Sequence, residues 1–106
     1  MSGSDKRAPE DCTSMEELRA EIDRVDDALF DLFAERMTYI HRAAELKAGI
    51  GLPANIPTRV DQVVENARRR AAAHGLAPEL YGSIWEKIVE AAIAEEERRL
   101  NGKAEQ

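Results

Sequence analysis

The hydrophobic positions of residues 14–48 recur at the spacing of one face of a helix. Thr13 and Ser14 precede two glutamates in the S/T-x-x-E pattern that satisfies free N–H groups at a helix start. No Gly or Pro follows before Gly49. The pattern therefore predicts a single helix about 50 Å long. Such a helix is longer than a domain of this mass is wide, so it cannot bury its apolar stripe against its own chain alone.

Two shorter helices are predicted after it. The segment GIGLPANIP, residues 49–57, holds two Gly and two Pro and is typical of a loop. Thr58 is the expected cap of a second helix that ends at Gly75, and Pro78 is expected to open a third that runs to about residue 100 or 101. Their expected buried sides are Val60, Val63, Val64 and Ala67 in the second, and Leu80, Ile84, Trp85, Ile88, Val89, Ala92 and Ile93 in the third. Because no strand pattern occurs, the predicted fold class is all-α, with a long, a short and a medium helix.

Composition and charge narrow the class of protein. The chain has 106 residues, of which 43% are hydrophobic and 34% charged, which fits one small soluble domain over residues 13–101, after a flexible lead-in at 1–12 and before a short tail at 102–106. The net charge of −6 argues against nucleic acid as a partner. No apolar run approaches the length of a membrane span, and the lone Cys12 excludes an internal disulfide. We expect a cytoplasmic protein that gains stability as a homo-oligomer.

Two cations interrupt the apolar stripe of the long helix. At 100° per residue, Lys47 lies only about 20° from Arg36, and both lie at the centre of the stripe. A charge removed from water needs an opposite charge, so an anion is expected opposite them. They are about 16 Å apart along the axis, with Ile40 and the small Ala43 between them on the same face. This spacing suits a small anionic ligand held between two long side chains.

Other interpretations of these cations stay open at this point. Each cation could form a structural ion pair with an acid of a later helix, and Lys47 could reach solvent because its helix ends soon after it. Arg19 lies about 25 Å from Arg36 on another side of the helix, so the two meet in one site only if one of them comes from a second copy of the chain.

The third helix carries the opposite anomaly. Trp85, Val89 and Ala92 lead at helical spacing to Glu96, which places a carboxylate on the apolar face. The alternative is that Glu96 belongs to the solvated charge run at residues 95–99. The three arginines at 68–70 are likewise interpreted as a solvated helix face rather than an anion site.

The spacing of the charged residues resembles that of the helical chorismate mutases. Arg19 is followed by Arg36 after 17 residues, by Lys47 after 11 more, and then by Arg59 at the start of the next helix. Leu18-Arg19, Ile22-Asp23, Val25-Asp26 and Glu35-Arg36-Met37 add to the resemblance, which covers residues 9–100. The opening Pro-Glu-Asp-Cys-Thr at 9–13 and the Arg-Met-x-Tyr at 36–39 are similar to the isochorismate-pyruvate lyases, which share this fold.

The resemblance implies an intertwined homodimer with two active sites, each of which takes one arginine from the partner subunit. Arg19 of one chain and Arg36 of the other would bind the two carboxylates of chorismate or isochorismate, with Arg59 assisting. Lys47 would donate to the ether oxygen. Bidentate guanidinium groups suit carboxylates, and an ammonium suits a single oxygen. The other residues predicted to contact the substrate are Ile40, Val60, Val63 and Ala92. No metal or cofactor is implied.

Two positions depart from the mutase pattern. Val60 stands where these mutases usually carry a Glu, and in this respect the chain is similar to the lyases. The acid Asp61 comes one position after the place of that Glu. Glu96 stands where a Gln is typical, although some mutases of this fold use Glu. Because an ionised carboxylate only accepts hydrogen bonds, we expect Glu96 to act in its protonated form.

The predicted function is the rearrangement of chorismate to prephenate in aromatic amino acid biosynthesis. The alternatives are an isochorismate-pyruvate lyase that serves salicylate biosynthesis, a mutase of an aminated chorismate, and a non-catalytic helical dimer in which Arg36 and Lys47 pair with glutamates.

Overall fold

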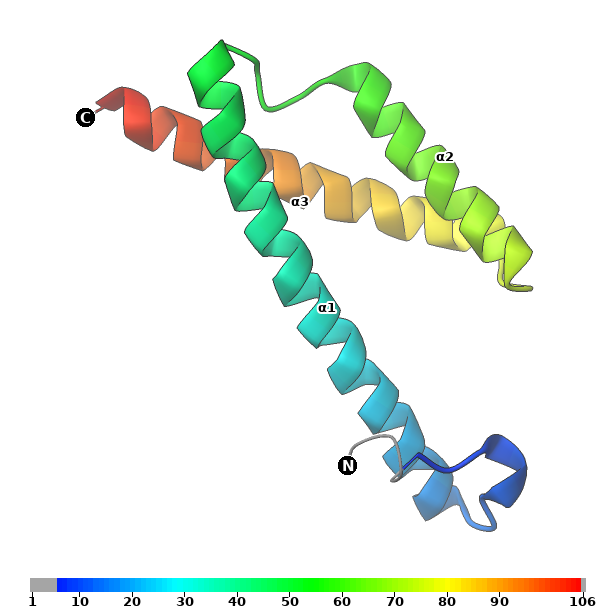
Figure 1. The fold of residues 1–106 in the computed structure, drawn as a ribbon. Coiled ribbons are helices and arrows are strands. Elements are labelled where there is room, and N and C mark those ends of the chain that lie inside the picture. The colour runs from blue at the N-terminus through cyan, green and yellow to red at the C-terminus, as the bar shows by residue number, and fades with distance from the viewer. Residues whose placement is uncertain (1–5, 106) are drawn as a thin grey trace. The chain divides into compact units, whose positions relative to one another are not determined.

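The computed structural model describes residues 6–105, and the ends of the predicted lead-in and tail, residues 1–5 and 106, lie outside this range. A 3-10 turn, η2 (Pro9–Asp11), precedes three helices, α1 (Met15–Ile50), α2 (Pro57–Ala73) and α3 (Pro78–Glu105) (Figure 1). The described range contains no strand, which confirms the all-α class and the order of a long, a short and a medium helix.

The start of α1 confirms the predicted cap. The Ser14 Oγ accepts a hydrogen bond of 3.1 Å from the backbone N–H of Glu17. The Glu17 carboxylate in turn accepts bonds of 2.7 Å and 3.0 Å from the backbone N–H and the hydroxyl of Thr13. The guanidinium of Arg7 also pairs with this carboxylate. Local hydrogen bonds thus set where the long helix begins.

We expect these contacts to appear as an acid-shifted titration of Glu17. The backbone bond from Thr13, then the bonds from Arg7 and the Thr13 hydroxyl, lower the pKa of Glu17 from 4.5 to about 2. Because the folded pKa lies below the ordinary one, the stabilisation is complete above pH 4.5 and is lost as the pH falls toward 2. An NMR titration should place the Glu17 midpoint near 2, and Glu17→Gln should reduce the acid-dependent drop in Tm. Glu16→Gln is the exposed neighbouring control; a Glu17 midpoint near its ordinary value would contradict the capped structure.

The end of α1 differs from the prediction by two residues. The helix continues past Ala48 to Ile50, so Gly49 lies in its last turn and the loop begins at Gly51. Gly51 has a φ of 74°, a conformation that Gly adopts without a steric penalty, and the N–H of Leu52 donates to the carbonyl of Lys47 at 2.9 Å. Of the two glycines, the one that adopts the left-handed conformation ends the helix.

The second and third helices also correct the predicted bounds. Ile56, not Thr58, caps α2, because Pro57 takes the first helical position, where its missing N–H costs nothing. At the other end Gly75, with a φ of 72°, closes the turn as predicted, and the N–H of Leu76 donates to the carbonyl of Ala71 at 2.8 Å. The third helix begins at Pro78 as predicted, but it continues beyond residue 101 to Glu105.

The chain forms two compact units, Met1–Arg36 and Met37–Gln106. In the second unit α2 packs alongside the first half of α3 (Figure 1). Its core consists of small side chains: Ala44, Ala54, Val64, Ala67, Ala71, Val89 and Ala92. Leu80 and Ile84, which we predicted to be buried, are exposed. Val89 and Ala92 are buried as predicted, on a line that also includes Gly82. The side chains of Leu80 and Ile84 point away from that line.

The first unit leaves the apolar stripe of α1 uncovered. Ile22, Val25, Leu29 and Leu32 are between 45% and 61% exposed. Within the first unit, this part of the stripe is therefore left unburied, as expected. Within the described range, no helix has an apolar stretch long enough to cross a membrane.

Candidate functional site

The centre of the candidate site is an ion pair between α1 and α3. The Lys47 ammonium donates to the Glu96 carboxylate at 2.7 Å and to the backbone carbonyl of Ala54 at 2.9 Å. Glu96 is 5% exposed and is the one charged residue that is buried in the part of the chain described. The pair therefore joins two helices and the loop between α1 and α2 at a single point with little access to water.

A small buried residue lies one turn before each partner of this pair. Ala44, one turn before Lys47 on α1, is 2% exposed, and Ala92, one turn before Glu96 on α3, is also buried. Because side chains three or four positions apart share a helix face, each alanine lies on the face that carries the charge. The sequence pattern that singled out Ala92 and Glu96 is thus confirmed as a buried face of α3.

The pair corrects one prediction about Lys47. We expected a bound anion to be the counter-ion of Lys47, but Glu96 of the same chain takes this role in the ligand-free protein. The alternative interpretation, a structural ion pair with an acid of a later helix, is therefore what the structure has at Lys47. Removing one partner of a buried ion pair typically costs about 3–5 kcal/mol, because the other charge is left uncompensated.

The remaining predicted site residues of the second unit lie on α1 and α2. Ile40 is half-buried on α1, and Val60 and Val63 are half-buried on α2. Arg59 is exposed in the first turn of α2, where its guanidinium donates to the side-chain oxygen of Gln62 at 2.7 Å. Arg59 therefore has a long side chain held by one local bond, which a stronger acceptor could replace.

The two other predicted arginines belong to the first unit. Arg19 is exposed near the start of α1, and Arg36 is half-buried at the last position of that unit. Both lie on the helix that carries the exposed stripe of Ile22 and Leu29. The first unit thus carries both arginines on the same helix as the uncovered apolar side chains.

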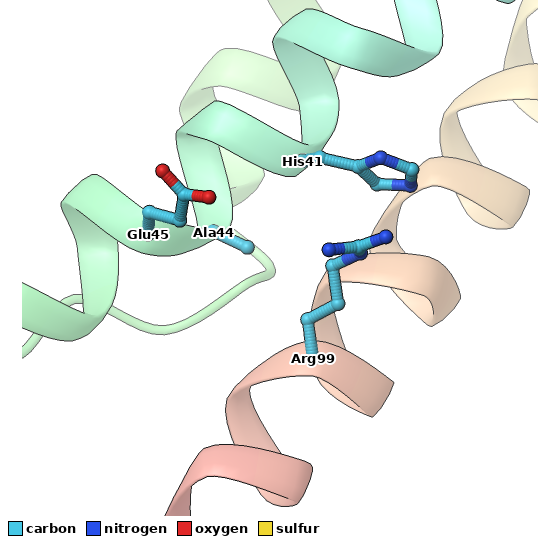
Figure 2. A pocket seen from close by; sticks show the side chains of 4 residues that line it. All are labelled: His41, Ala44, Glu45 and Arg99. Atoms are coloured by element: carbon cyan, nitrogen blue, oxygen red, sulfur yellow. The ribbon is translucent and has the colours of Figure 1, made fainter.

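A second polar contact between α1 and α3 was missed from the sequence. The Nε2 of His41 bonds to the Glu95 carboxylate at 2.8 Å, and the Arg99 Nε donates to the same carboxylate oxygen at 3.2 Å. A hollow of about 40 Å³ lies beside them, lined by His41, Ala44, Glu45 and Arg99 (Figure 2). Glu95 was assigned to a solvated charge run. The available signal was the spacing of His41, Ala44 and Lys47, which puts all three on one side of α1.

The three consecutive arginines of α2 differ in their environments. Arg69 and Arg70 are exposed, as expected for a solvated face. Arg68 is half-buried, within 4 Å of the carboxylates of Glu65, Glu79 and Glu86. Arg68 therefore links α2 to α3 rather than binding an external anion.

Comparison with known proteins supplies the context for this arrangement. Residues 18–97 match the family described as chorismate mutase type II. This range includes Arg19, Arg36, Lys47, Arg59 and Glu96.

Three relatives illustrate the range of proteins whose sequences are similar to this one. The chain is 33% identical over 79 residues to the T-protein of Enterobacter agglomerans, covering 74% of this chain and 21% of that protein. It is 32% identical over 91 residues to the isochorismate pyruvate lyase of Pseudomonas aeruginosa, covering 85% of this chain and 88% of that protein. It is 35% identical over 75 residues to the 4-amino-4-deoxychorismate mutase of Streptomyces venezuelae, covering 71% and 73%. The chain thus spans about a fifth of the T-protein and most of the other two.

Proposed function

This chain belongs to the chorismate mutase type II family, and on that premise we propose that it is a chorismate mutase, which rearranges chorismate to prephenate. The observation that carries the proposal is the Lys47–Glu96 pair, because it holds an ammonium donor at a buried position between two helices. An ammonium has three N–H donors, and the bonds to Glu96 and Ala54 leave the third for a ligand oxygen.

For this reaction the protein needs only to hold the substrate in position and to stabilise the charge that develops on it. In one molecule of chorismate the ether C–O bond breaks while a C–C bond forms, and negative charge grows on the ether oxygen in the transition state. A donor fixed in a site with little water stabilises that charge without first having to reorganise. Lys47 is the proposed donor. Holding the substrate in its reactive conformation lowers the barrier further, because the reacting atoms are already close.

Glu96 is proposed to act in two states. In the ligand-free protein its carboxylate accepts from Lys47 and keeps the ammonium aligned. To donate to the ether oxygen itself, Glu96 must take up a proton, since a carboxylate only accepts. The arrival of a substrate with two negative charges favours this proton uptake, because like charges in one site repel.

The two substrate carboxylates are assigned to arginines. We assign them to Arg36 of one chain and Arg19 of the partner subunit, with Arg59 assisting from the first turn of α2. The exposed stripe of α1 supports the homodimer in this proposal, because four large apolar side chains of the first unit need a cover that a second copy of the helix would supply.

The second candidate function is an isochorismate-pyruvate lyase. It is favoured by the relative that is named for this activity, whose alignment covers most of both chains. Val60 also favours it, because a valine cannot accept the hydrogen bond that the ring hydroxyl of chorismate would donate to a carboxylate at this position. The same Lys47 donor would serve, since isochorismate also breaks an ether C–O bond while a hydrogen moves to the departing pyruvate.

One assay tests the proposal and separates its alternatives. Purified protein is incubated in parallel with chorismate, isochorismate and 4-amino-4-deoxychorismate, and the products are separated by chromatography. We expect chorismate to give prephenate with the highest kcat/KM. Salicylate and pyruvate from isochorismate as the preferred reaction would favour the lyase, and preferred turnover of the amino substrate would identify an amino-chorismate mutase. Conversion of none of the three would favour a non-catalytic dimer.

A further inference from the structure

Two neighbouring glutamates of α3 bind side chains of the same segment of α1. Glu96 binds Lys47 at 2.7 Å, and Glu95 binds His41 at 2.8 Å. Since successive residues of a helix point about 100° apart, the two carboxylates reach α1 from different sides of α3. Their partners are six residues apart, which is about 9 Å along the axis of α1. The second unit therefore has two separate polar anchors between these helices.

The Glu95 carboxylate is held more firmly than an ordinary surface carboxylate. One oxygen accepts from both His41 and Arg99, and the other pairs with Arg98. The Glu95 side chain is 18% exposed and that of His41 is 29% exposed, so water has limited access to the pair. Figure 2 shows the Arg99 guanidinium and the His41 ring facing each other beside the small hollow. Three donors thus fix the direction in which Glu95 points.

Few apolar side chains of α1 are fully buried at this junction. Ala44 is the one residue of α1 that is buried in the range described, and its side chain is a single methyl group. The polar anchors therefore act together with the packing of α3 against α2 to set how α3 is rotated and where it lies along α1. A second anchor about 9 Å from the first along α1 resists rotation of α3 about the Lys47–Glu96 contact.

We propose that the His41–Glu95 pair is a positioning device that holds Glu96 in line with Lys47, so that the Lys47 ammonium points at the reacting oxygen. The role rests on the proposed function, because it serves the donor assigned to the ether oxygen. His41 and Glu95 do not touch the substrate. They act by fixing the last turns of α3, and without them the Lys47–Glu96 bond samples a wider range of geometries.

The first test follows the Lys47 ammonium in the ligand-free protein and does not require activity. Its ¹⁵N signal, assigned from the spectrum of Lys47→Met, should be protected from exchange with water. We expect His41→Ala to lose this protection and His41→Gln, whose amide can still donate to Glu95, to retain most of it. Arg42→Ala is the matched control, because Arg42 is the next residue and pairs at 2.8 Å with the exposed Glu45. An unchanged Lys47 signal in His41→Ala would overturn the proposal.

The second test separates positioning from binding. We expect His41→Ala to lower kcat by about 10-fold to 100-fold, the cost of a misplacement of about 1 Å, with little change in KM. His41→Gln should recover most of the loss, and Arg42→Ala should match the unmodified protein. A raised KM at unchanged kcat, or no kinetic change, would show that the pair does not position the donor.

The two tests distinguish the failure of this inference from the failure of the proposed function. If the unmodified protein converts no substrate, the function fails while the NMR measurement still decides the role of the pair. If His41→Ala does not fold, as judged by thermal unfolding, Glu95→Leu tests the same anchor with a side chain of similar size that has no acceptor, and the same loss of Lys47 protection is expected.

Discussion

Lys47→Met is expected to lower kcat for the rearrangement by about 100-fold to 1000-fold, the usual effect of removing a donor aimed at developing charge. Met keeps most of the length and apolar volume of Lys but has no N–H to donate. Nothing then stabilises the ether oxygen from the position where Lys47 lies against Glu96. Substrate consumption at saturating concentration measures kcat directly. KM should change less than kcat, because the carboxylates of the substrate are assigned to the arginines.

The same substitution has a second effect that must be separated from the first. It leaves Glu96, 5% exposed, without its counter-ion, so the free energy of unfolding should fall by about 3 kcal/mol. The double variant Lys47→Met/Glu96→Gln removes that charge and should recover much of the stability without recovering turnover. Lys87→Met, at an exposed position of α3, controls for the loss of one positive charge. Wild-type turnover in Lys47→Met would eliminate Lys47 as the donor.

The sequence predicts best those features that depend on neighbouring residues. The cap at Ser14 is confirmed because its partner, Glu17, is three positions away and the hydrogen bonds are local. The start of α3 is confirmed because Pro78 fixes its own backbone conformation. The predicted end of α1 was two residues early because either Gly49 or Gly51 could end a helix. Only the left-handed conformation at Gly51 shows which of the two does so.

The candidate site was predictable residue by residue, but the contacts within it were not. Helical periodicity placed Lys47 and Glu96 on apolar faces, where charged residues require an explanation. That the two pair with each other depends on where α1 meets α3, which the pattern of neither helix alone specifies. The contact between His41 and Glu95 was missed because it also depends on where α1 meets α3. In addition, Glu95 belongs to a charge run near a helix end, which resembles a solvated surface in any sequence.

Mixing two inactive variants should restore activity if the sites are shared between subunits. Arg19→Ala and Arg36→Ala each remove one of the two guanidinium groups assigned to the substrate carboxylates, so each alone should lose about 100-fold or more in kcat/KM. In a mixed dimer, one site combines Arg19 of one chain with Arg36 of the other, and both are intact there. The second site of that dimer lacks both.

Random association makes half of the dimers mixed, so about a quarter of all sites should be intact after equal amounts are unfolded together and refolded. Activity should vary with the mixing ratio, reach its maximum at equal amounts, and have the KM of the unmodified protein. Arg69→Ala mixed with Arg36→Ala is the matched control: Arg69 is exposed on α2 outside the proposed site, so activity there should only follow the share of intact Arg36 chains. Absence of recovery at every ratio, with both variants shown to be folded and to exchange subunits, would mean that each chain binds its substrate without the partner's Arg19.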